Sequence, residues 1–168
     1  MKTIRAILLL FFIPLLVFFG ACGEKSDLLA PFRGAYRADL AGELRGVAFG
    51  AVLEAEAPRE DGARTLTLTF YAPASLSGTV VKSTADGALS LTAGGVTVEG
   101  VQAKGFLPLL TLLPSSGDIE KIETDGAGHS IVTGKGFTLT LTRDGTPIAV
   151  ESAEVSATIV RFDLLPAS

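Results

Sequence analysis

The stretch that decides the fold is "TLTLTFY", residues 65–71, in which leucine and phenylalanine alternate with threonine. Successive side chains of a β-strand point to opposite faces, so this period of two places Leu66, Leu68 and Phe70 on one face. The threonines fall on the other face, where a β-branched side chain packs well and its hydroxyl tolerates water. The pattern predicts a half-buried antiparallel strand.

The same alternation recurs in "FTLTLT", residues 137–142, and more weakly across residues 35–57, where Gly42, Gly46 and Gly50 are candidate kink points. Further strands are expected at residues 77–83, 88–93, 96–101, 118–124, 129–134, 147–152 and 154–163. Turn sequences such as "REDG", "ADG", "TDGAG" and "RDGTP" separate these segments. About 8–11 short strands with close turns predict a mainly β fold, with an antiparallel sheet that is curled into a barrel or folded as a sandwich.

One segment breaks the alternation: "GFLPLLTLLPSSGD", residues 105–118, has clustered apolar residues. Pro108 suits the first turn of a helix, and Pro114 would stop one. We expect a short apolar helix or helical loop that closes the sheet. It serves either as ordinary core closure or as a lid over an apolar cavity.

The N-terminus has the organisation of a secretory signal. Lys2 and Arg5 precede an apolar run, residues 6–19, which the small residues Gly20 and Ala21 follow. The run is about 14 residues long, whereas a membrane-spanning helix needs roughly 20, so a permanent transmembrane helix is disfavoured.

The signal ends in "FGAC", residues 19–22, which resembles the lipobox of bacterial lipoproteins. In that family the cysteine becomes the first mature residue and carries a diacylglyceryl group and often a further acyl chain such as palmitate. The resemblance implies a removed signal peptide over 1–21, lipidated Cys22 with a tether over 22–34, and a single β domain over 35–168. Cys22 is the only cysteine, so it has no disulfide partner within the chain. The alternative is an ordinary signal peptide with a chance cysteine.

Lipidation of Cys22 would place the protein on a bacterial cell membrane, facing the extracytoplasmic side, because two acyl chains suffice for stable anchoring. Gly23 occupies the position where an aspartate retains some Gram-negative lipoproteins in the inner membrane. The periplasmic face of an outer membrane and the outer surface of a Gram-positive membrane therefore remain alternatives.

The composition disfavours several classes of partner. The chain carries a net charge of −4 with its basic residues dispersed, so we expect no nucleic-acid partner. It contains no tryptophan and two tyrosines, so aromatic platforms that stack on bases or sugars are scarce.

Catalytic patterns are also scarce. His129 is the only histidine, which leaves too few ligands for a structural zinc site. A Ser–His–Asp arrangement that used Ser130 or Ser116 lacks the G-x-S-x-G context. We expect no catalytic residues, no metal and no cofactor apart from the covalent lipid on Cys22.

Residues 62–100 follow a longer pattern: a strand, the proline corner "APASLSG", a strand, "ADG", a strand, "GG" and another strand. This order resembles the central part of the LolA-like lipoprotein carrier superfamily, and the similarity in element order extends over about residues 36–163. It implies an incomplete, half-open antiparallel β-barrel whose apolar concave side is closed by short helices and shelters an acyl chain. The chain departs from the carrier in its expected anchor and in lacking a helix-rich N-terminal segment.

Two functions follow as hypotheses. The first is a membrane-anchored, non-catalytic binding protein for a lipid or other hydrophobic ligand. The alternative is a structural or interaction lipoprotein of the cell envelope with a filled core and a protein partner. The candidate cavity-lining residues, each of which could equally be plain core, are Phe70, Phe106, Leu107, Leu109, Leu110, Leu112 and Leu113.

Overall fold

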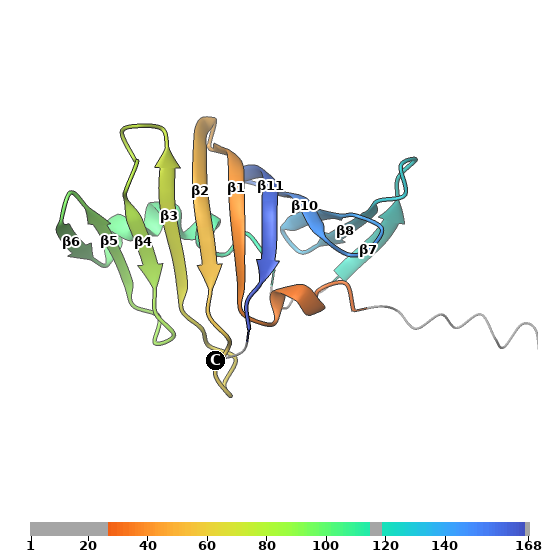
Figure 1. The fold of residues 1–168 in the computed structure, drawn as a ribbon, viewed down its shortest axis with the longest axis horizontal. Helices are drawn as coiled ribbons and strands as arrows, with labels where there is room; N and C mark the ends of the chain where they lie inside the picture. The colour runs from red at the N-terminus through yellow and green to blue at the C-terminus, as the bar shows by residue number, and fades with distance from the viewer. Residues whose placement is uncertain (1–26, 115–118, 167–168) are drawn as a thin grey trace, which may run out of the picture.

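The computed structural model describes residues 27–114 and 119–166, which form one unclosed antiparallel sheet of eleven strands (Figure 1). The first six strands are β1 (Tyr36–Leu44), β2 (Val47–Ala55), β3 (Leu66–Ala72), β4 (Val80–Ser83), β5 (Leu89–Ala93) and β6 (Val96–Glu99). The remaining five are β7 (Ile119–Thr124), β8 (Ser130–Gly134), β9 (Phe137–Leu141), β10 (Pro147–Ser152) and β11 (Val155–Leu164). The predicted mainly β, half-open architecture is confirmed.

The first and last strands lie side by side at the centre of the sheet. The strand order is β6-β5-β4-β3-β2-β1-β11-β10-β9-β8-β7, so the chain meanders outward from β1 and returns inward from β7. Tyr36 lies opposite Leu164 at one end of the central pair, and Leu44 lies opposite Val155 at the other. The sheet therefore has two free edges, β6 and β7.

Weak alternation over residues 35–57 resolves into two strands joined by a tight turn. Arg45 and Gly46 have φ angles of 51° and 78°. Positive φ at both central residues is the geometry of a type I′ hairpin, which matches the twist of the flanking strands. Gly42 serves a different purpose: a Cβ there would overlap the carbonyl oxygen of Ser156 in β11. The glycine lets the two central strands approach closely.

The core lies on the concave face of the sheet. Leu53 of β2, Leu68 of β3 and Val81 of β4 are cross-strand neighbours in one row, and all three are fully buried. The apolar side chains of the alternating stretch 65–71 therefore share the inward face of the sheet, as the period of two predicted.

A helical segment crosses this concave face (Figure 1). It consists of a 3₁₀ helix, η2 (Val101–Phe106), and one turn of α-helix, α2 (Leu107–Leu110), with Pro108 in the first turn as expected. The segment begins earlier than the predicted residue 105 and its helical part ends at Leu110, before Pro114. Thr111 is the C-terminal capping residue, and its amide and hydroxyl both donate to the Leu107 carbonyl, at 3.0 Å each.

Residues that precede residue 35, the expected start of the domain, also pack against the sheet. Leu29 and Phe32 are buried, and Phe32 belongs to a short 3₁₀ helix, η1 (Ala30–Phe32). The Phe32 ring packs edge-on against Tyr36 and Phe162, with ring centroids 6.0 and 5.5 Å away. The end of the expected tether thus packs into the core through Leu29 and Phe32, with Leu28 partly buried against it.

Residues 1–21 and Cys22 lie outside the described residues, so the signal peptide and the lipidation stay predictions. Among the residues that are described, no helix has the length and apolar character needed to cross a membrane.

Candidate functional site: a groove beside the helical segment

The space between the helical segment and the middle of the sheet is filled by the protein's own side chains. The Phe70 ring packs against Phe106 and Phe49, with centroid distances of 5.3 and 6.4 Å. Leu109 and Leu110 of α2 are fully buried beside them. This part of the concave face is therefore packed core.

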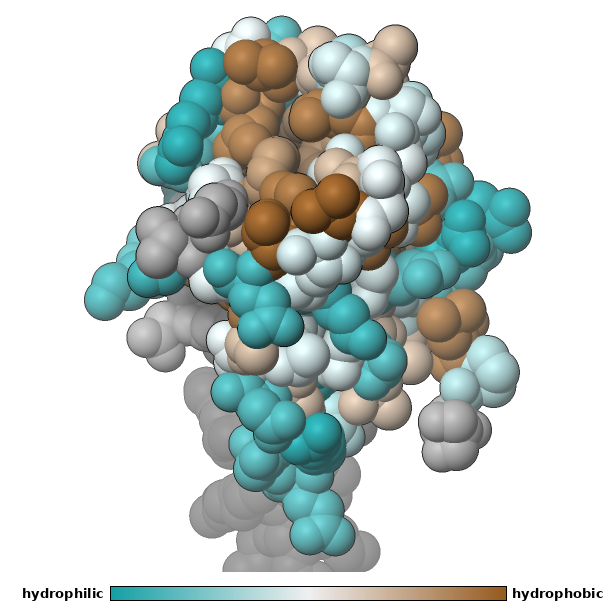
Figure 2. Space-filling view, turned by 90° about the vertical axis from the view of Figure 1, so that its left-hand side faces the viewer, coloured by the Kyte–Doolittle hydropathy of each residue, from teal (hydrophilic) through white to brown (hydrophobic). Residues whose placement is uncertain are grey.

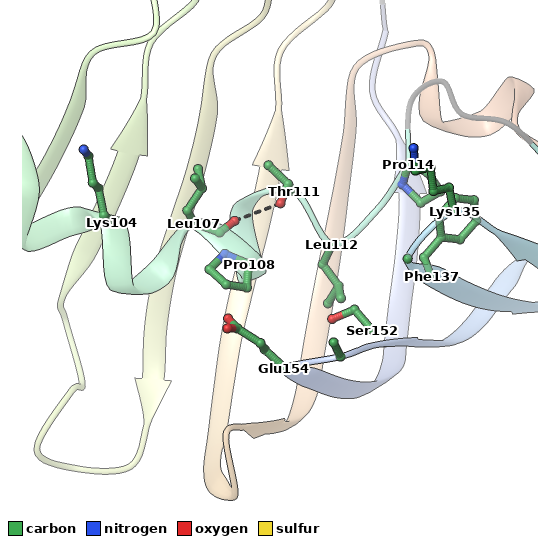
Figure 3. A pocket seen from close by; sticks show the side chains of 12 residues that line it. Lys104, Leu107, Pro108, Thr111, Leu112, Pro114, Lys135, Phe137, Ser152 and Glu154 are labelled. Atoms are coloured by element: carbon green, nitrogen blue, oxygen red, sulfur yellow. Dashed lines mark hydrogen bonds between the residues drawn. The ribbon is translucent and has the colours of Figure 1, made fainter.

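An open cavity of about 490 Å³ lies alongside the filled core (Figure 3). One wall is the helical segment with the residues that follow it, and the other is formed by the β8–β9 and β10–β11 turns. The lining residues are Lys104, Leu107, Pro108, Thr111, Leu112, Pro114, Lys135, Gly136, Phe137, Ser152, Ala153 and Glu154. We call this cavity the groove.

The groove combines apolar walls with a charged rim. Leu107, Leu112 and Phe137 supply apolar surface, whereas Lys104 and Lys135 carry positive charges. Neither lysine forms an ion pair with any residue in the described ranges. Such a site can accept a molecule that has an apolar part and a negatively charged group.

The acidic residue of the rim already has a partner. Glu154 in the β10–β11 turn accepts a hydrogen bond from Arg45 in the β1–β2 turn, at 2.8 Å. The Arg45 amide also donates to the Glu154 carbonyl, at 2.8 Å. These two contacts hold the two turns together and fix one end of the groove.

The structure divides the seven predicted lining residues into two groups. Leu107 and Leu112 lie in the groove. The rest pack in or against the core, namely Phe70, Phe106, Leu109, Leu110 and Leu113.

Other groove residues were not anticipated. Lys135 and Glu154 come from two turns whose proximity depends on the strand order, which alternation does not reveal. Only the short turn sequences "GKG" (residues 134–136) and "SAE" (residues 152–154) could have drawn attention to them. A second, shallower cavity of about 330 Å³ adjoins the groove and shares Phe137 and Ser152 with it.

Residues 27–114 and 119–166 leave the concave face uncovered toward both edges of the sheet. Figure 2 looks onto the side where β6 forms the edge and shows apolar side chains gathered around a hollow. In β6, Val96 and Val98 are exposed. At the opposite edge, Ile119 and Ile122 of β7 are exposed as well.

The single histidine lies in the β7–β8 hairpin. His129 Nδ1 is 2.9 Å from Asp125 Oδ2, and Asp125 Oδ1 accepts hydrogen bonds from the amides of His129 and Ala127. The hydrogen bond from the His129 backbone amide, more than any other contact, lowers the pKa of the Asp125 carboxyl. The aspartate therefore serves to shape the hairpin, and no hydrogen bond joins Ser130 to the histidine ring among the described residues.

Other acidic side chains are distributed rather than clustered. Glu54 pairs with Arg37 at 3.2 Å, and Glu123 pairs with Lys121 at 2.7 Å. Within residues 27–114 and 119–166, no group of three or more His, Cys, Asp or Glu side chains is placed to hold a metal ion.

No protein-family model and no curated protein sequence matches the chain. Solved structures do match its fold. An uncharacterized conserved protein from Thermus thermophilus superposes with a TM-score of 0.51 at 14% identity, over 84% of this chain and 85% of that one. MucB superposes with a TM-score of 0.52 at 16% identity, over 88% of this chain. This chain spans 61% of the length of MucB.

A LolA superfamily protein from Nitrosomonas europaea is a weaker structural match, with a TM-score of 0.48 at 10% identity over 81% of this chain and 88% of that one. The similarity to the Thermus protein and to MucB establishes a shared fold and nothing about activity. The overall fold of this chain is therefore one that other proteins also adopt.

Proposed function

We propose that the protein is a non-catalytic, extracytoplasmic lipoprotein, anchored through Cys22, that holds an apolar or acyl ligand in the groove. The observation that carries this proposal is the cavity of about 490 Å³ with Leu107, Leu112 and Phe137 in its walls. Ligand sites in proteins commonly have volumes of about 300–1,000 Å³, mostly apolar walls and a few polar groups that fix orientation. The groove meets this description.

The resemblance of residues 62–100 to the LolA-like carriers supports the same ligand class. Binding would bury apolar surface and include no covalent step. Lys104 and Lys135 would attract a negatively charged headgroup at the rim. The ligand that fits best is therefore an acyl chain with an acidic end.

Entry of the ligand would leave the helical segment in place. Leu109 and Leu110 are buried in the core, so lifting α2 would expose them at a cost of roughly 1.5–3 kcal/mol each. Leu107 is 40% exposed and lines the groove together with the buried Leu112. The ligand would slide in beside the segment, between it and the β10–β11 turn.

Fatty-acid titration of residues 24–168, purified without detergent, tests the proposal. Leu107 and Leu165 are both 40% exposed, so Leu165→Asp is a matched control for Leu107→Asp. We expect Leu107→Asp to weaken binding about tenfold or more, equivalent to about 1.4 kcal/mol, and Leu165→Asp to leave it unchanged. Equal affinities for the two variants, or no uptake by the unsubstituted domain, would refute a ligand site in the groove.

Native mass spectrometry of the same preparation would identify a co-purifying ligand. A reproducible additional mass with the extraction properties of a lipid supports the proposal. A clean apo mass, together with failed fatty-acid uptake, favours the second candidate function.

That second candidate is an envelope interaction protein, and the two free edges of the sheet favour it. Edge strands present unpaired backbone N–H and C=O groups that can pair with a strand from a partner. Val96 and Val98 on β6, with Ile122 on β7, add exposed apolar surface at these edges. In-cell photo-crosslinking from position 97 of β6 tests this candidate, with position 82 on the covered strand β4 as the control.

A further inference from the structure

The distance between the expected anchor and the folded domain is short. Only residues 23–26 separate Cys22 from Asp27, the first described residue. Five residue steps span at most about 18 Å even when fully extended. The part of the domain next to Asp27 must therefore stay close to the membrane, an inference that rests on the proposed lipid anchor.

The domain end that adjoins Asp27 is well defined. Burial of Leu29 and Phe32 fixes η1 against the start of β1 and the end of β11, so this end cannot swing freely on the tether. Leu164 at the end of β11 is 62% exposed, and Leu165 follows it. The Leu165 amide donates to the Ala35 carbonyl at 2.9 Å, which places both leucines beside the entry of the chain into the sheet.

The described residues form two ion pairs at this end, whereas Glu56, Glu60 and Asp61 of the β2–β3 loop have no ion-pair partner among them. Arg33 pairs with Asp27 at 2.5 Å, and Arg59 pairs with Asp86 at 3.0 Å. A lipid surface would therefore meet this end through its exposed leucines rather than through a basic patch.

The groove lies toward the opposite end of the central strands. Glu154, at its rim, is paired with Arg45 in the β1–β2 turn, whereas η1 lies at the start of β1. Nine residues of β1 and ten of β11 separate the two ends, which corresponds to about 30 Å at a rise of roughly 3.4 Å per residue. Figure 1 shows the β1–β2 turn and η1 at opposite ends of these strands.

We propose that the end formed by η1, Leu164 and Leu165 is a membrane-contact surface, and that the rim of the groove at Glu154 faces away from the membrane. The protein then receives its ligand from a soluble donor or from a facing membrane. Direct lateral capture of lipid from its own bilayer would require a groove at the other end. The anchor thus determines the side from which the ligand arrives.

Depth-dependent fluorescence quenching on the full-length lipoprotein in phosphatidylcholine–phosphatidylglycerol vesicles tests this orientation. If Cys22 is acylated, an introduced cysteine is the only free thiol. Leu164→Cys and Ala48→Cys place one exposed thiol at each end of the central strands and can be labelled with the same environment-sensitive dye. Mass spectrometry of the intact protein measures acylation separately, and circular dichroism confirms the fold of each variant.

We expect spin-labelled lipid to quench the dye at position 164 at least threefold more than the dye at position 48, and aqueous iodide to show the reverse order. Equal quenching, or stronger lipid quenching at position 48, would overturn the orientation in an acylated protein. An unacylated Cys22 would overturn the anchoring itself, and with it the orientation. The two failures are distinguishable because the mass reports only on the anchor.

Discussion

The centre and the edge of the sheet carry the same sequence pattern but differ in burial. Val81 of β4, Leu91 of β5 and Val98 of β6 are cross-strand neighbours on the concave face. Val81 is fully buried, Leu91 is half-buried and Val98 is 38% exposed. These three apolar residues lie at increasing distance from the covered middle of the sheet. Alternation therefore specifies the face of the sheet on which a side chain lies. Whether that side chain is buried depends on whether the helical segment covers it.

The other half of the sheet repeats this gradient. Leu139 of β9 and Val132 of β8 are buried, and Ile122, their neighbour in β7, is 49% exposed. Apolar residues at both edges are thus continuous with the core but lie beyond its cover. This continuity makes the edges candidates for further contacts.

The largest expected difference between centre and edge is in the free energy of unfolding. Phe70→Ala removes a buried ring from between Phe49 and Phe106 and should lower stability by about 3–5 kcal/mol. Val98→Ala removes a partly exposed side chain and should cost less than about 1 kcal/mol. Urea unfolding of residues 24–168 measures both values. Similar losses would show that the edge is as well packed as the centre.

Alkaline pH should lower the free energy of unfolding through Tyr36, which lies in the centre of the sheet. Burial raises the pKa of its phenol to about 12, and the nearby Arg64 opposes this shift. Below pH 10 the phenol is neutral in both states, so its contribution to stability is complete. Between about pH 10 and 12 the unfolded chain loses the proton and the folded chain keeps it, so stability falls by roughly 2–3 kcal/mol. Tyr36→Phe should remove this difference in urea unfolding series at pH 9 to 12; an unchanged slope would contradict the assignment.

A substitution that disturbs the close approach of β1 and β11 should have a smaller effect on stability. Gly42→Ala would push a Cβ against the Ser156 carbonyl and should destabilise the domain by about 1–3 kcal/mol. Gly105→Ala in η2 meets no atom within 4 Å and serves as the control, with no loss expected. Thermal unfolding compares the two variants. Equal midpoints would show that β1 and β11 can separate at no cost.

Substitution at an exposed edge position should have the smallest effect. Val96→Thr changes an exposed side chain of β6 and should alter stability by no more than about 0.5 kcal/mol. Differential scanning calorimetry measures the change. A larger loss would indicate that β6 packs against something beyond its neighbour β5.

Much of the fold could be predicted because it depends on local patterns. Alternation in residues 65–71 and 137–142 predicted the strands and their inward faces, and Pro108 predicted the first turn of the helix. The packing of Leu29 and Phe32 was missed because the few apolar residues of this short segment show no periodicity. Their burial depends on a site formed by Tyr36 and Phe162, which are far apart in the sequence.

The groove was less predictable than the fold. Leu109 and Leu112 look alike in the sequence and both are buried, yet only Leu112 also lines the groove. The direction in which each points depends on where the helix ends and on how the chain continues past Thr111. Lys135 and Glu154 required knowledge of the strand order, because they reach the groove from separate hairpins.

Pairing of β1 with β11 also sets a time order for assembly. In the growing chain, β1 can pair with β2 at once, but its second neighbour is the last strand to be synthesised. Residues 45–154 separate β1 from β11 in the chain, so an interval separates the two pairings when the exported chain emerges from its N-terminus. During that interval one side of β1 remains an open template for strand pairing. Premature termination before Val155 would make this open edge permanent.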